Sequence, residues 1–371
     1  MDAMPKVIGL MSGTSLDGID AALVETDGER VGRRGFAFTL PYAPETRALL
    51  QAAVRAAAGT AENRTEGAFA EAECRLTEAH ALAVRILLDW SGRKRRDIAL
   101  VGFHGQTVLH RPETRRTWQI GDGAMLARLT GIDTVNDFRS ADVAAGGEGA
   151  PLVPLYHAAL VKSAPALKPP VAVANIGGVA NVTYVGETVL AFDTGPGNGP
   201  LDDWARAHTG RPVDIDGRLA LSGRVDEAAL AAMLAHPYFT RRPPKSLDRA
   251  DFGTDRVAHL SAADGAATLS AFTAAAIARA AEHFPAPVSA WVISGGGRRN
   301  PAILGELKKR IAVPVLTAEA VGWNGDMLEA EAFAFLAVRS VRGLPLSLPA
   351  TTGVPRPLAG GVLHRAKRGL S

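Results

Sequence analysis

Apolar residues occur along this chain in short blocks, and the blocks near the start have the borders of strands. The first, Val7–Met11, enters a loop of small polar residues, and the second, Ile19–Glu25, follows that loop. A turn at Thr26–Gly28 leads to a third block around Gly35–Leu40. Short apolar runs bounded by Gly, Asp and Ser are typical of β-strands. We therefore expect three consecutive strands joined by tight turns.

Helical spacing of apolar residues follows the third strand. It predicts helices over Pro44–Ala58 and Ala61–Trp90. A buried strand is expected over Asp97–Phe103. It delivers His104–Thr107 at its C-terminal end, which is where ligands bind in open α/β sheets. Two further strands, separated by a helix, are expected over 117–120 and 132–135.

The second half of the chain opens as the first half does. An apolar strand over Val171–Asn175 enters a glycine turn, and a returning strand follows over Asn181–Val185. A third strand over Thr188–Phe192 carries Asp193 at its end. The shared pattern indicates an internal structural duplication. The glycine-rich segment Ala144–Pro151 is the expected boundary between the halves, as a hinge or a binding loop.

The remainder of the second half alternates between helical and strand patterns. Helices are expected over 199–208, 216–223, 226–234, 264–283, 301–311 and 326–339, and strands over 288–294 and 314–316. The last segment, Leu344–Val362, is rich in Pro and Gly, and we expect it to fold back onto the first half.

Composition adds few constraints. The chain has 371 residues, 47% hydrophobic and 21% charged, which is ordinary for a globular protein with two domains. The net charge of +3 is mild, and the only dense basic run is Arg93–Arg96, so a nucleic-acid partner is not expected.

Cys74 is the single cysteine, which excludes an internal disulfide. No apolar run is long enough for a membrane span, and no signal peptide is evident. A cytoplasmic location is expected.

Three glycine-rich turns follow apolar strands, at Ser12–Gly18, Asn175–Asn181 and Ser294–Asn300. Backbone N–H groups of such turns can surround phosphate groups, and the first turn adds three hydroxyls. Asp17, directly behind them, suits the Mg²⁺ that accompanies a nucleotide. The Lys of a Walker A loop is absent. The three turns favour a nucleotide-binding site in which glycine turns contact the phosphate chain from opposite sides. The alternative is that they are ordinary loops.

Asp193 is the residue best placed for acid–base work. It ends a strand and precedes Gly195-Pro-Gly197, which holds the backbone stiff and close to a ligand. A carboxylate in reach of a hydroxyl or water can accept its proton. The alternative is that Asp193 caps its own loop as an Asx-turn. His104 could contact a substrate, although a strand-end histidine with a purely structural role is the more common case. The spacing of the nine histidines does not predict a metal site.

The motifs together resemble the anhydro-N-acetylmuramic acid kinase family of the actin/Hsp70/sugar-kinase superfamily, over essentially the whole chain. The matching segments are Gly9–Asp20, His104–Thr107, Gln119–Asp122, Asn136–Arg139, Gly146–Pro154, Asn175–Asn181, Asp193–Asn198, Pro244–Ser246 and Ser294–Gly297.

The resemblance implies a reaction. Family members use ATP, Mg²⁺ and water to convert 1,6-anhydro-N-acetylmuramic acid to N-acetylmuramic acid 6-phosphate in peptidoglycan recycling. Asp193 matches the catalytic aspartate that would activate water. The residues assigned to ATP are Gly13, Thr14, Ser15, Leu16, Asp17, Gly18, Ile19, Asp20, Gly177, Gly178, Gly295, Gly296, Gly297 and Asn300. Those assigned to the sugar are His104, Gln106, Thr107, Arg139 and Glu329, and Asp17 is the candidate Mg²⁺ ligand.

The resemblance also implies an architecture. The expected fold class is α/β, a two-lobed actin-like (ribonuclease H-like) ATPase fold with duplicated mixed sheets flanked by helices. The expected first lobe is 1–139 plus 343–371 and the second is 140–342, with ATP and the amino sugar in the cleft between them. The family forms homodimers. The sequence departs from the family pattern at Glu148, Gly199-Pro200, Trp323-Asn324 and Met327-Leu328. These departures put the exact substrate preference in question.

Two alternatives remain open at the level of the sequence. One is a kinase for an ordinary sugar hydroxyl on the same fold, whose product would take no oxygen from water. The other is a non-metabolic actin/Hsp70-like ATPase. The variety of polar motifs at strand ends argues against the second, because a switch protein needs no sugar pocket.

Overall fold

The computed structural model describes residues 4–366, which form two compact units. Unit 1 combines the N-terminal part of the chain up to Ser163 with the part from Met327 onward, and unit 2 is Ala164–Asp326. The boundaries differ from those of the expected lobes. The segments 140–163 and 327–342 belong to unit 1, because the helix in 327–342 packs on the sheet of that unit. The glycine-rich segment Ala144–Pro151 therefore lies inside unit 1.

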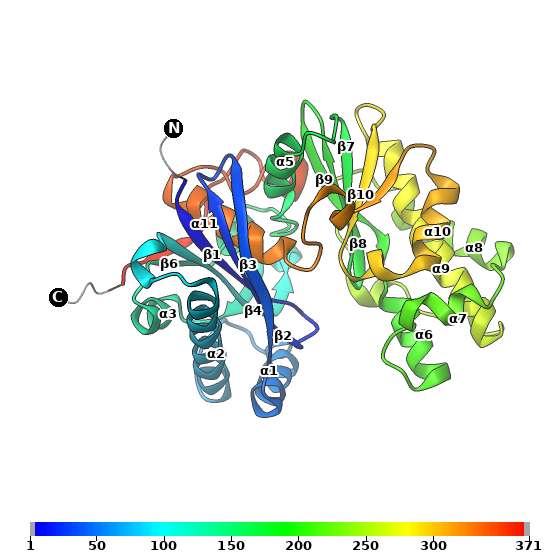
Figure 1. Cartoon of the computed structure of the whole chain (residues 1–371). Helices are drawn as coiled ribbons and strands as arrows, with labels where there is room; N and C mark the ends of the chain where they lie inside the picture. Colours follow the sequence, from blue (N-terminus) through cyan, green and yellow to red (C-terminus); the bar gives the residue numbers. More distant parts are fainter. Residues whose placement is uncertain (1–3, 367–371) are drawn as a thin grey trace. The chain divides into compact units, whose positions relative to one another are not determined.

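Unit 1 is built on a seven-stranded mixed sheet (Figure 1). The strand order is β12-β6-β4-β1-β2-β3, with β5 paired to β4. The strands are β1 Lys6–Ser12, β2 Gly18–Thr26, β3 Val31–Pro41, β4 Leu100–Arg111, β5 Arg116–Ile120, β6 Thr134–Asn136 and β12 Val362–His364. The helices are α1 Pro44–Ala57, α2 Ala68–Ser91, α3 Gly123–Thr130, α4 Ser140–Ala144, α5 Pro154–Ser163, α11 Leu328–Val341 and α12 Pro349–Thr352.

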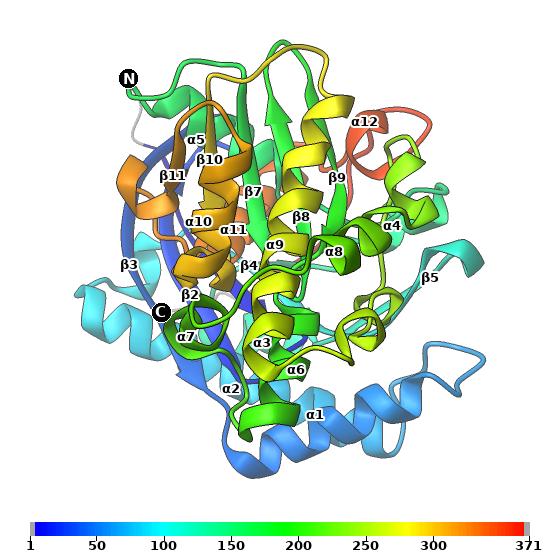
Figure 2. The same cartoon turned by 90° about the vertical axis from the view of Figure 1, so that its right-hand side faces the viewer.

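Unit 2 repeats the pattern on a five-stranded sheet of order β11-β10-β7-β8-β9. Its strands are β7 Val171–Ile176, β8 Val179–Val185, β9 Val189–Pro196, β10 Ala290–Ser294 and β11 Val315–Thr317. Its helices are α6 Gly199–Thr209, α7 Arg218–Leu221, α8 Glu227–Leu234, α9 Ala262–Arg279 and α10 Pro301–Arg310. Figure 2 shows α9 and α10 crossing one face of these strands.

The two sheets share one topology. In each, three antiparallel strands lead into two parallel ones, as β3-β2-β1-β4-β6 and as β9-β8-β7-β10-β11. The predicted duplication of mixed sheets flanked by helices is confirmed. As a result, the β1–β2 turn of unit 1 corresponds to the β7–β8 turn of unit 2.

Helix α11 approaches the sheet of unit 1 unusually closely. Gly9 and Gly102 are register partners on β1 and β4. A Cβ on Gly9 would lie 1.8 Å from the carbonyl oxygen of Ala330, and one on Gly102 would lie 2.1 Å from that of Phe333. Only glycine fits at these two positions. The opposite face of the sheet is covered by α2, whose Leu76 and other apolar residues join the core formed with β1 and β4.

Several predicted boundaries need correction. The helix expected over 61–90 begins only at Ala68, because Asn63 pairs with the backbone of Thr117 and keeps the preceding segment extended along β5. The strand expected over 97–103 starts at Leu100 and continues to Arg111, because it pairs with β5 beyond Phe103. The predicted return of the C-terminal segment is confirmed, since β12 pairs with β6.

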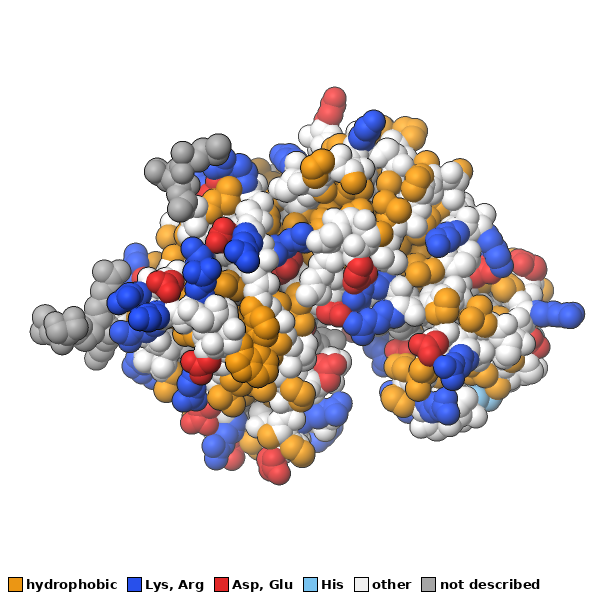
Figure 3. Space-filling view, in the orientation of Figure 1, with side chains coloured by type: hydrophobic (Ala, Val, Ile, Leu, Met, Phe, Trp, Pro, Cys, Tyr) orange, Lys and Arg blue, Asp and Glu red, His pale blue; other side chains and the backbone are white. Residues whose placement is uncertain are grey.

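The described residues include no helix long and apolar enough to cross a membrane. Figure 3 shows hydrophobic side chains gathered over the region of α2 and β3. Phe36 on β3 and Trp90 on α2, 37% and 65% exposed, contact each other edge to face with ring centroids 5.6 Å apart.

Candidate active site

The first candidate element is the β1–β2 turn of unit 1. Thr14, Ser15 and Asp17 are exposed, and Ser15 donates a hydrogen bond to the Asp17 carboxylate at 2.7 Å. Leu16 adopts a left-handed backbone conformation with φ 54° and closes the turn through its N–H to Gly13 O at 3.2 Å. Its side chain is buried. The turn therefore presents hydroxyls and one carboxylate to solvent while its apolar residue anchors it.

Tyr42, which the sequence did not predict as a site residue, forms hydrogen bonds with both ends of this turn. Its backbone N–H donates to Asp17 O at 3.1 Å, and its hydroxyl donates to Ser12 Oγ at 2.7 Å. Ser12 in turn donates to Gln106 Oε1 at 2.5 Å. Gln106, which the resemblance assigns to the sugar, is fully buried and connects β4 to the β1–β2 turn through Ser12.

A second candidate element is centred on Arg139, which lies just before α4. Its guanidinium donates to His104 Nε2 at 3.1 and 3.0 Å and to Gly149 O at 2.7 Å. Burial, together with the charge of Arg139, holds the pKa of His104 well below its usual value. Burial raises the pKa of the Glu329 carboxyl against the attraction of Arg139. Unit 1 thus brings three of the predicted sugar residues, His104, Arg139 and Glu329, into one electrostatic cluster.

The glycine-rich loop that contacts Arg139 is itself fixed. The buried Asp142 carboxylate accepts the N–H of Gly149 at 2.7 Å and the hydroxyl of Thr352 at 2.6 Å. Glu148, the departure from the family pattern, donates its backbone N–H to Thr352 O at 2.7 Å. The C-terminal segment therefore holds this loop in place.

Thr107, the remaining predicted sugar residue, belongs to a polar row between β4 and β5. Gln119 Nε2 donates to Thr107 Oγ1 at 3.2 Å and to Thr117 Oγ1 at 2.8 Å. Gln119 Oε1 is buried without a hydrogen-bond partner among the described residues. A buried acceptor of this kind is costly unless a ligand or water satisfies it. The sequence had shown Gln119 only as part of a motif.

In unit 2, three glycine turns converge. The Gly197 and Gly199 N–H groups both bond to Gly178 O, at 3.0 and 3.1 Å. A Cβ on Gly295 would lie 2.4 Å from Asn175 Oδ1, and one on Gly297 would lie 2.3 Å from Ile176 Cγ2. The structure therefore brings two of the three predicted turns together with the Gly197–Gly199 turn, all at the same ends of β7, β9 and β10.

Asn300, assigned to ATP, starts α10. Its side-chain oxygen accepts the N–H groups of Ala302 at 3.0 Å and Ile303 at 3.4 Å, so it caps the helix as the sequence predicted. Next to the third glycine turn, Arg298 is buried and bonds to Gly295 O, Glu319 and Asp326. These ion pairs stiffen the turn, and no side-chain pattern in the sequence had marked Arg298.

Asp193 lies at the end of β9 against the segment Lys245–Arg249, here called the strap. Leu247 donates its backbone N–H to Asp193 Oδ2 at 2.8 Å, and Asp193 donates its own N–H to Lys245 O at 3.0 Å. Tyr238 donates its hydroxyl to Asp193 O. Three hydrogen bonds thereby hold the backbone and one carboxylate oxygen of Asp193 in place.

Lys245, whose backbone carbonyl accepts the Asp193 N–H, has a buried side chain. Its Nζ lies 4.5 Å from the ring centre of Tyr238 and donates to Tyr238 O at 3.3 Å. Burial, reinforced by Arg241 and Arg279, lowers its pKa to about 8. The aromatic face and carbonyl compensate part of the cost of burying this charge.

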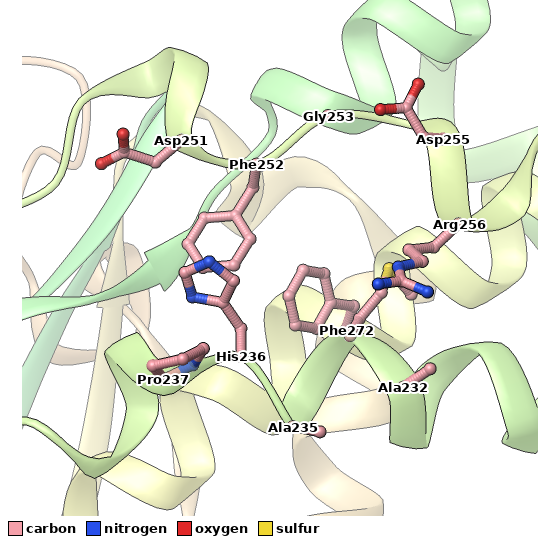
Figure 4. A pocket seen from close by; sticks show the side chains of 11 residues that line it. Ala232, Ala235, His236, Pro237, Asp251, Phe252, Gly253, Asp255, Arg256 and Phe272 are labelled. Carbon is pink, nitrogen blue, oxygen red and sulfur yellow. The ribbon is translucent and has the colours of Figure 1, made fainter.

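The segment that follows the strap lines a cavity of about 340 Å³, shown in Figure 4. Phe252 stands in it between His236 and Phe272, with ring centroids 4.9 and 5.5 Å away. This aromatic packing anchors the chain three residues after Arg249.

Within residues 4–366, no three His, Cys, Asp or Glu side chains come together as a metal-binding group. Mg²⁺ is typically bound through one or two carboxylates and nucleotide phosphates. The exposed Asp17 carboxylate beside the hydroxyls of the β1–β2 turn fits that donor set.

The repeated strand order and the glycine turns at equivalent strand ends define an α/β protein of the actin-like class. Residues 5–366 match the family model described as anhydro-N-acetylmuramic acid kinase. The chain therefore belongs to the anhydro-N-acetylmuramic acid kinase family, which confirms the predicted family and enzyme class.

Individual relatives agree with the family model. The chain is 58% identical to the anhydro-N-acetylmuramic acid kinase of Acidiphilium cryptum over 364 residues, covering 96% of this chain and 98% of the relative. It is 55% identical to that of Paramagnetospirillum magneticum over 362 residues, covering 96% and 99%. Among solved structures, component A of the Acidaminococcus fermentans (R)-2-hydroxyglutaryl-CoA dehydratase matches with a TM-score of 0.48 at 13% identity, covering 91% of this chain and 99% of that chain.

Proposed function

We propose that this protein is an ATP-dependent kinase that hydrolytically opens the 1,6-anhydro ring of 1,6-anhydro-N-acetylmuramic acid and phosphorylates O6. The products are N-acetylmuramic acid 6-phosphate and ADP, as needed for peptidoglycan recycling. The observation that carries the proposal is the family match over residues 5–366, with relatives above 50% identity along nearly their full lengths.

Asp193 is the general base of this proposal. Its carboxylate accepts a proton from water, the water oxygen bonds to C1, and the C1–O6 bond breaks. O6 takes the γ-phosphoryl group, whose bond to the bridging oxygen of ATP breaks as ADP leaves. Asp193 then releases its proton to solvent. The Leu247 N–H bond to Oδ2 holds the carboxylate in one orientation.

The glycine turns are proposed to bind ATP. In unit 1, residues Gly13–Asp20 offer hydroxyls and backbone N–H groups, which suit phosphate. In unit 2, Gly178 and Gly296 are exposed and Gly177 and Gly295 are half-buried, so their backbone groups are proposed to contact the nucleotide, while Gly297 packs against Ile176. Mg²⁺, held through Asp17, would neutralise charge on the phosphates. The role of these residues is to align the phosphoryl group, since phosphoryl transfer depends mainly on positioning and electrostatics.

The sugar is proposed to bind at the His104, Arg139 and Glu329 cluster and at Thr107. Arg139 would offer N–H groups and Glu329 its carboxyl to the hydroxyl and amide groups of the sugar, while His104 orients Arg139. Gln106 supports the site from behind, through Ser12. The proposal requires this cluster in unit 1 and Asp193 in unit 2 to meet the same sugar molecule.

The test is ADP release by the purified protein with 1,6-anhydro-N-acetylmuramic acid, run in H₂¹⁸O with mass analysis of the product. One ¹⁸O at C1 for each phosphate at O6 is the expected result. Phosphorylation without ¹⁸O would identify a kinase for an ordinary sugar hydroxyl instead. Slow ATP hydrolysis that does not respond to the sugar would identify an ATPase of the actin/Hsp70 kind and overturn the proposal.

A cytoplasmic homodimer completes the proposal, because the resemblance implies one and the substrate pair of ATP and a recycled sugar is found inside the cell. Sedimentation velocity at micromolar concentration tests the dimer. A single species at the mass of one 38.8 kDa chain would refute it.

A further inference from the structure

Arg249 lies directly on the glycine turns of unit 2. A Cβ on Gly178 would lie 3.4 Å from Arg249 Cδ, and one on Gly199 would lie 3.2 Å from Arg249 Nε. The side chain therefore passes over the β7–β8 turn and the first residue of α6. Both glycines leave room for this side chain, and no sequence motif had assigned Arg249 a role.

The guanidinium is only loosely held in this position. It donates to Asp203 Oδ1 at 2.9 Å and to Gly199 O at 3.4 Å. The Arg249 and Asp203 side chains are 53% and 48% exposed. An exposed ion pair of this kind contributes little to the stability of the folded protein. A phosphate, which a guanidinium can bind with two parallel hydrogen bonds, would compete effectively for it.

The backbone of Arg249 is connected to the general base. Leu247, two residues earlier on the strap, donates its N–H to Asp193 Oδ2 at 2.8 Å. Phe252, three residues later, is anchored between His236 and Phe272 (Figure 4). The strap therefore connects Asp193, through Leu247, to a guanidinium that lies over Gly178 and Gly199. If Asp193 and these glycine turns act in one reaction, the phosphoryl group nearest the reacting sugar has to lie close to the strap.

We propose that Arg249 is a catalytic residue that binds the γ-phosphoryl group of ATP during its transfer to O6. The inference rests on the proposed function. As the bond from the γ-phosphorus to the bridging oxygen breaks and the bond to O6 forms, the electron pair of the breaking bond passes to ADP. Arg249 leaves Asp203 and neutralises charge on the non-bridging oxygens of the moving group. Lysine would supply the charge without the two-pronged geometry.

The matched control is Arg206, which pairs with the same Asp203 oxygen at 3.8 Å. Arg206 has a similarly exposed side chain, 62%, and lies within α6. Arg206→Met removes a positive charge and an ion pair with Asp203, as Arg249→Met does. Only Arg249 lies over the glycine turns, so only its loss is expected to affect phosphoryl transfer.

The experiment compares wild type, Arg249→Met, Arg249→Lys, Arg206→Met and Asp203→Asn in sugar-dependent ADP release. Removing one aligned donor to a transition state typically costs about 10²–10³-fold in kcat. We expect that loss for Arg249→Met, with the KM for the sugar unchanged, and a partial recovery for Arg249→Lys. Arg206→Met and Asp203→Asn should stay within about twofold of wild type. Equal kcat for Arg249→Met and wild type would overturn the inference.

A binding measurement separates this inference from the proposed function. Calorimetry without sugar compares the affinities for ADP and for a non-hydrolysable ATP analogue. Wild type should prefer the triphosphate, and Arg249→Met should lose at least tenfold of that preference while its affinity for ADP stays the same. A preference that survives in Arg249→Met would overturn the inference. Absence of sugar turnover in a wild-type protein whose preference depends on Arg249 would instead overturn only the proposed function.

Discussion

The guanidinium of Arg139 donates two hydrogen bonds to a single atom, Nε2 of His104. That atom must therefore be the unprotonated nitrogen, and Nδ1 carries the proton that is donated to Gly105 O at 2.8 Å. Burial and the Arg139 charge lower the pKa of His104, which keeps the ring neutral. His104 thus orients Arg139 rather than acting as an acid.

Replacing Arg139 tests this arrangement. Arg139→Met removes the donors to His104 and Gly149 and leaves the buried Glu329 without its cation. We expect sugar-dependent kcat/KM to fall by about 10–100-fold, the range for losing charge-assisted hydrogen bonds. Affinity for an ATP analogue should not change. Arg128→Met, at an exposed position of α3, is the control. A normal KM for the sugar in Arg139→Met would contradict the assignment.

Asp193→Asn tests the general base. The amide oxygen of Asn can still accept the Leu247 N–H, so the strap should keep its conformation. We expect ring opening and phosphorylation to fall together by about 10²–10⁴-fold, the usual contribution of a general base. Calorimetry should show unchanged ATP binding. If the variant still phosphorylates the anhydro-sugar, Asp193 has another role.

Tyr42→Phe tests how the β1–β2 turn is held. The change removes the hydroxyl that bonds Ser12 and keeps the ring and the backbone bond to Asp17 O. Loss of one hydrogen bond of this kind costs about 1 kcal/mol. We expect the KM for ATP to rise by about fivefold, with the KM for the sugar unchanged. Tyr184→Phe in the core of unit 2 is the matched control. Equal effects on both KM values would indicate a general loss of stability.

Gly9→Ala tests the contact between α11 and the sheet. The added Cβ would meet the Ala330 carbonyl at 1.8 Å, so the helix has to move. We expect the free energy of unfolding to fall by at least about 3 kcal/mol, as for severe overpacking. Gly305→Ala, inside α10 with no atom within 4 Å of the new Cβ, should instead stabilise by up to about 1 kcal/mol. Urea denaturation measures both. A stable Gly9→Ala protein would refute the close packing.

Glu331→Gln tests a buried acid outside the site. Tyr156 donates to Glu331 Oε2 at 2.6 Å, and burial raises the pKa of Glu331 to about 7. The folded protein therefore holds a proton that the unfolded chain releases above about pH 4.5, so wild type loses stability as the pH rises from about 4.5 to 7.

The glutamine keeps the acceptor and does not titrate. The variant should match wild type near pH 4.5 and exceed its unfolding free energy by on the order of 3 kcal/mol at pH 8. Glu66→Gln, at an exposed position, is the control. Parallel stability curves for Glu331→Gln and wild type between pH 4.5 and 8 would refute the assignment.

Much of the fold followed from the sequence because its strands carry uniform apolar blocks between clear turn residues. Helix α5 was not predicted. Of its ten residues, seven are buried, among them Tyr156 and His157, so it has no polar face to give a helical period. The continuation of β4 past Phe103 was missed for a related reason. Gln106 is polar, yet it is fully buried by its bond to Ser12.

The sequence predicts the motif residues of the candidate site, but it does not predict the residues that hold them in place. Tyr42 reaches Ser12 from 30 positions away, and Leu247 reaches Asp193 from 54 positions away. Leu247 acts through its backbone N–H, which no side-chain pattern reveals. Arg249 lies near the turns on a segment that is anchored by the Leu247 backbone on one side and by Phe252 in an aromatic cluster on the other.

The glycine turns of the two units are under different mutational constraints. In unit 1, a Cβ on Gly13 would have Ser15 Oγ at 3.7 Å as its nearest neighbour, and Thr14 and Ser15 are exposed. In unit 2, a Cβ on Gly197, in the turn that follows β9, would lie 2.1 Å from the backbone oxygen of Gly177 in the β7–β8 turn. Loss of side chains should therefore damage the β1–β2 turn, and addition of a side chain the turn after β9. An engineer has to vary side-chain chemistry in unit 1 and keep the close backbone packing of Gly197 in unit 2.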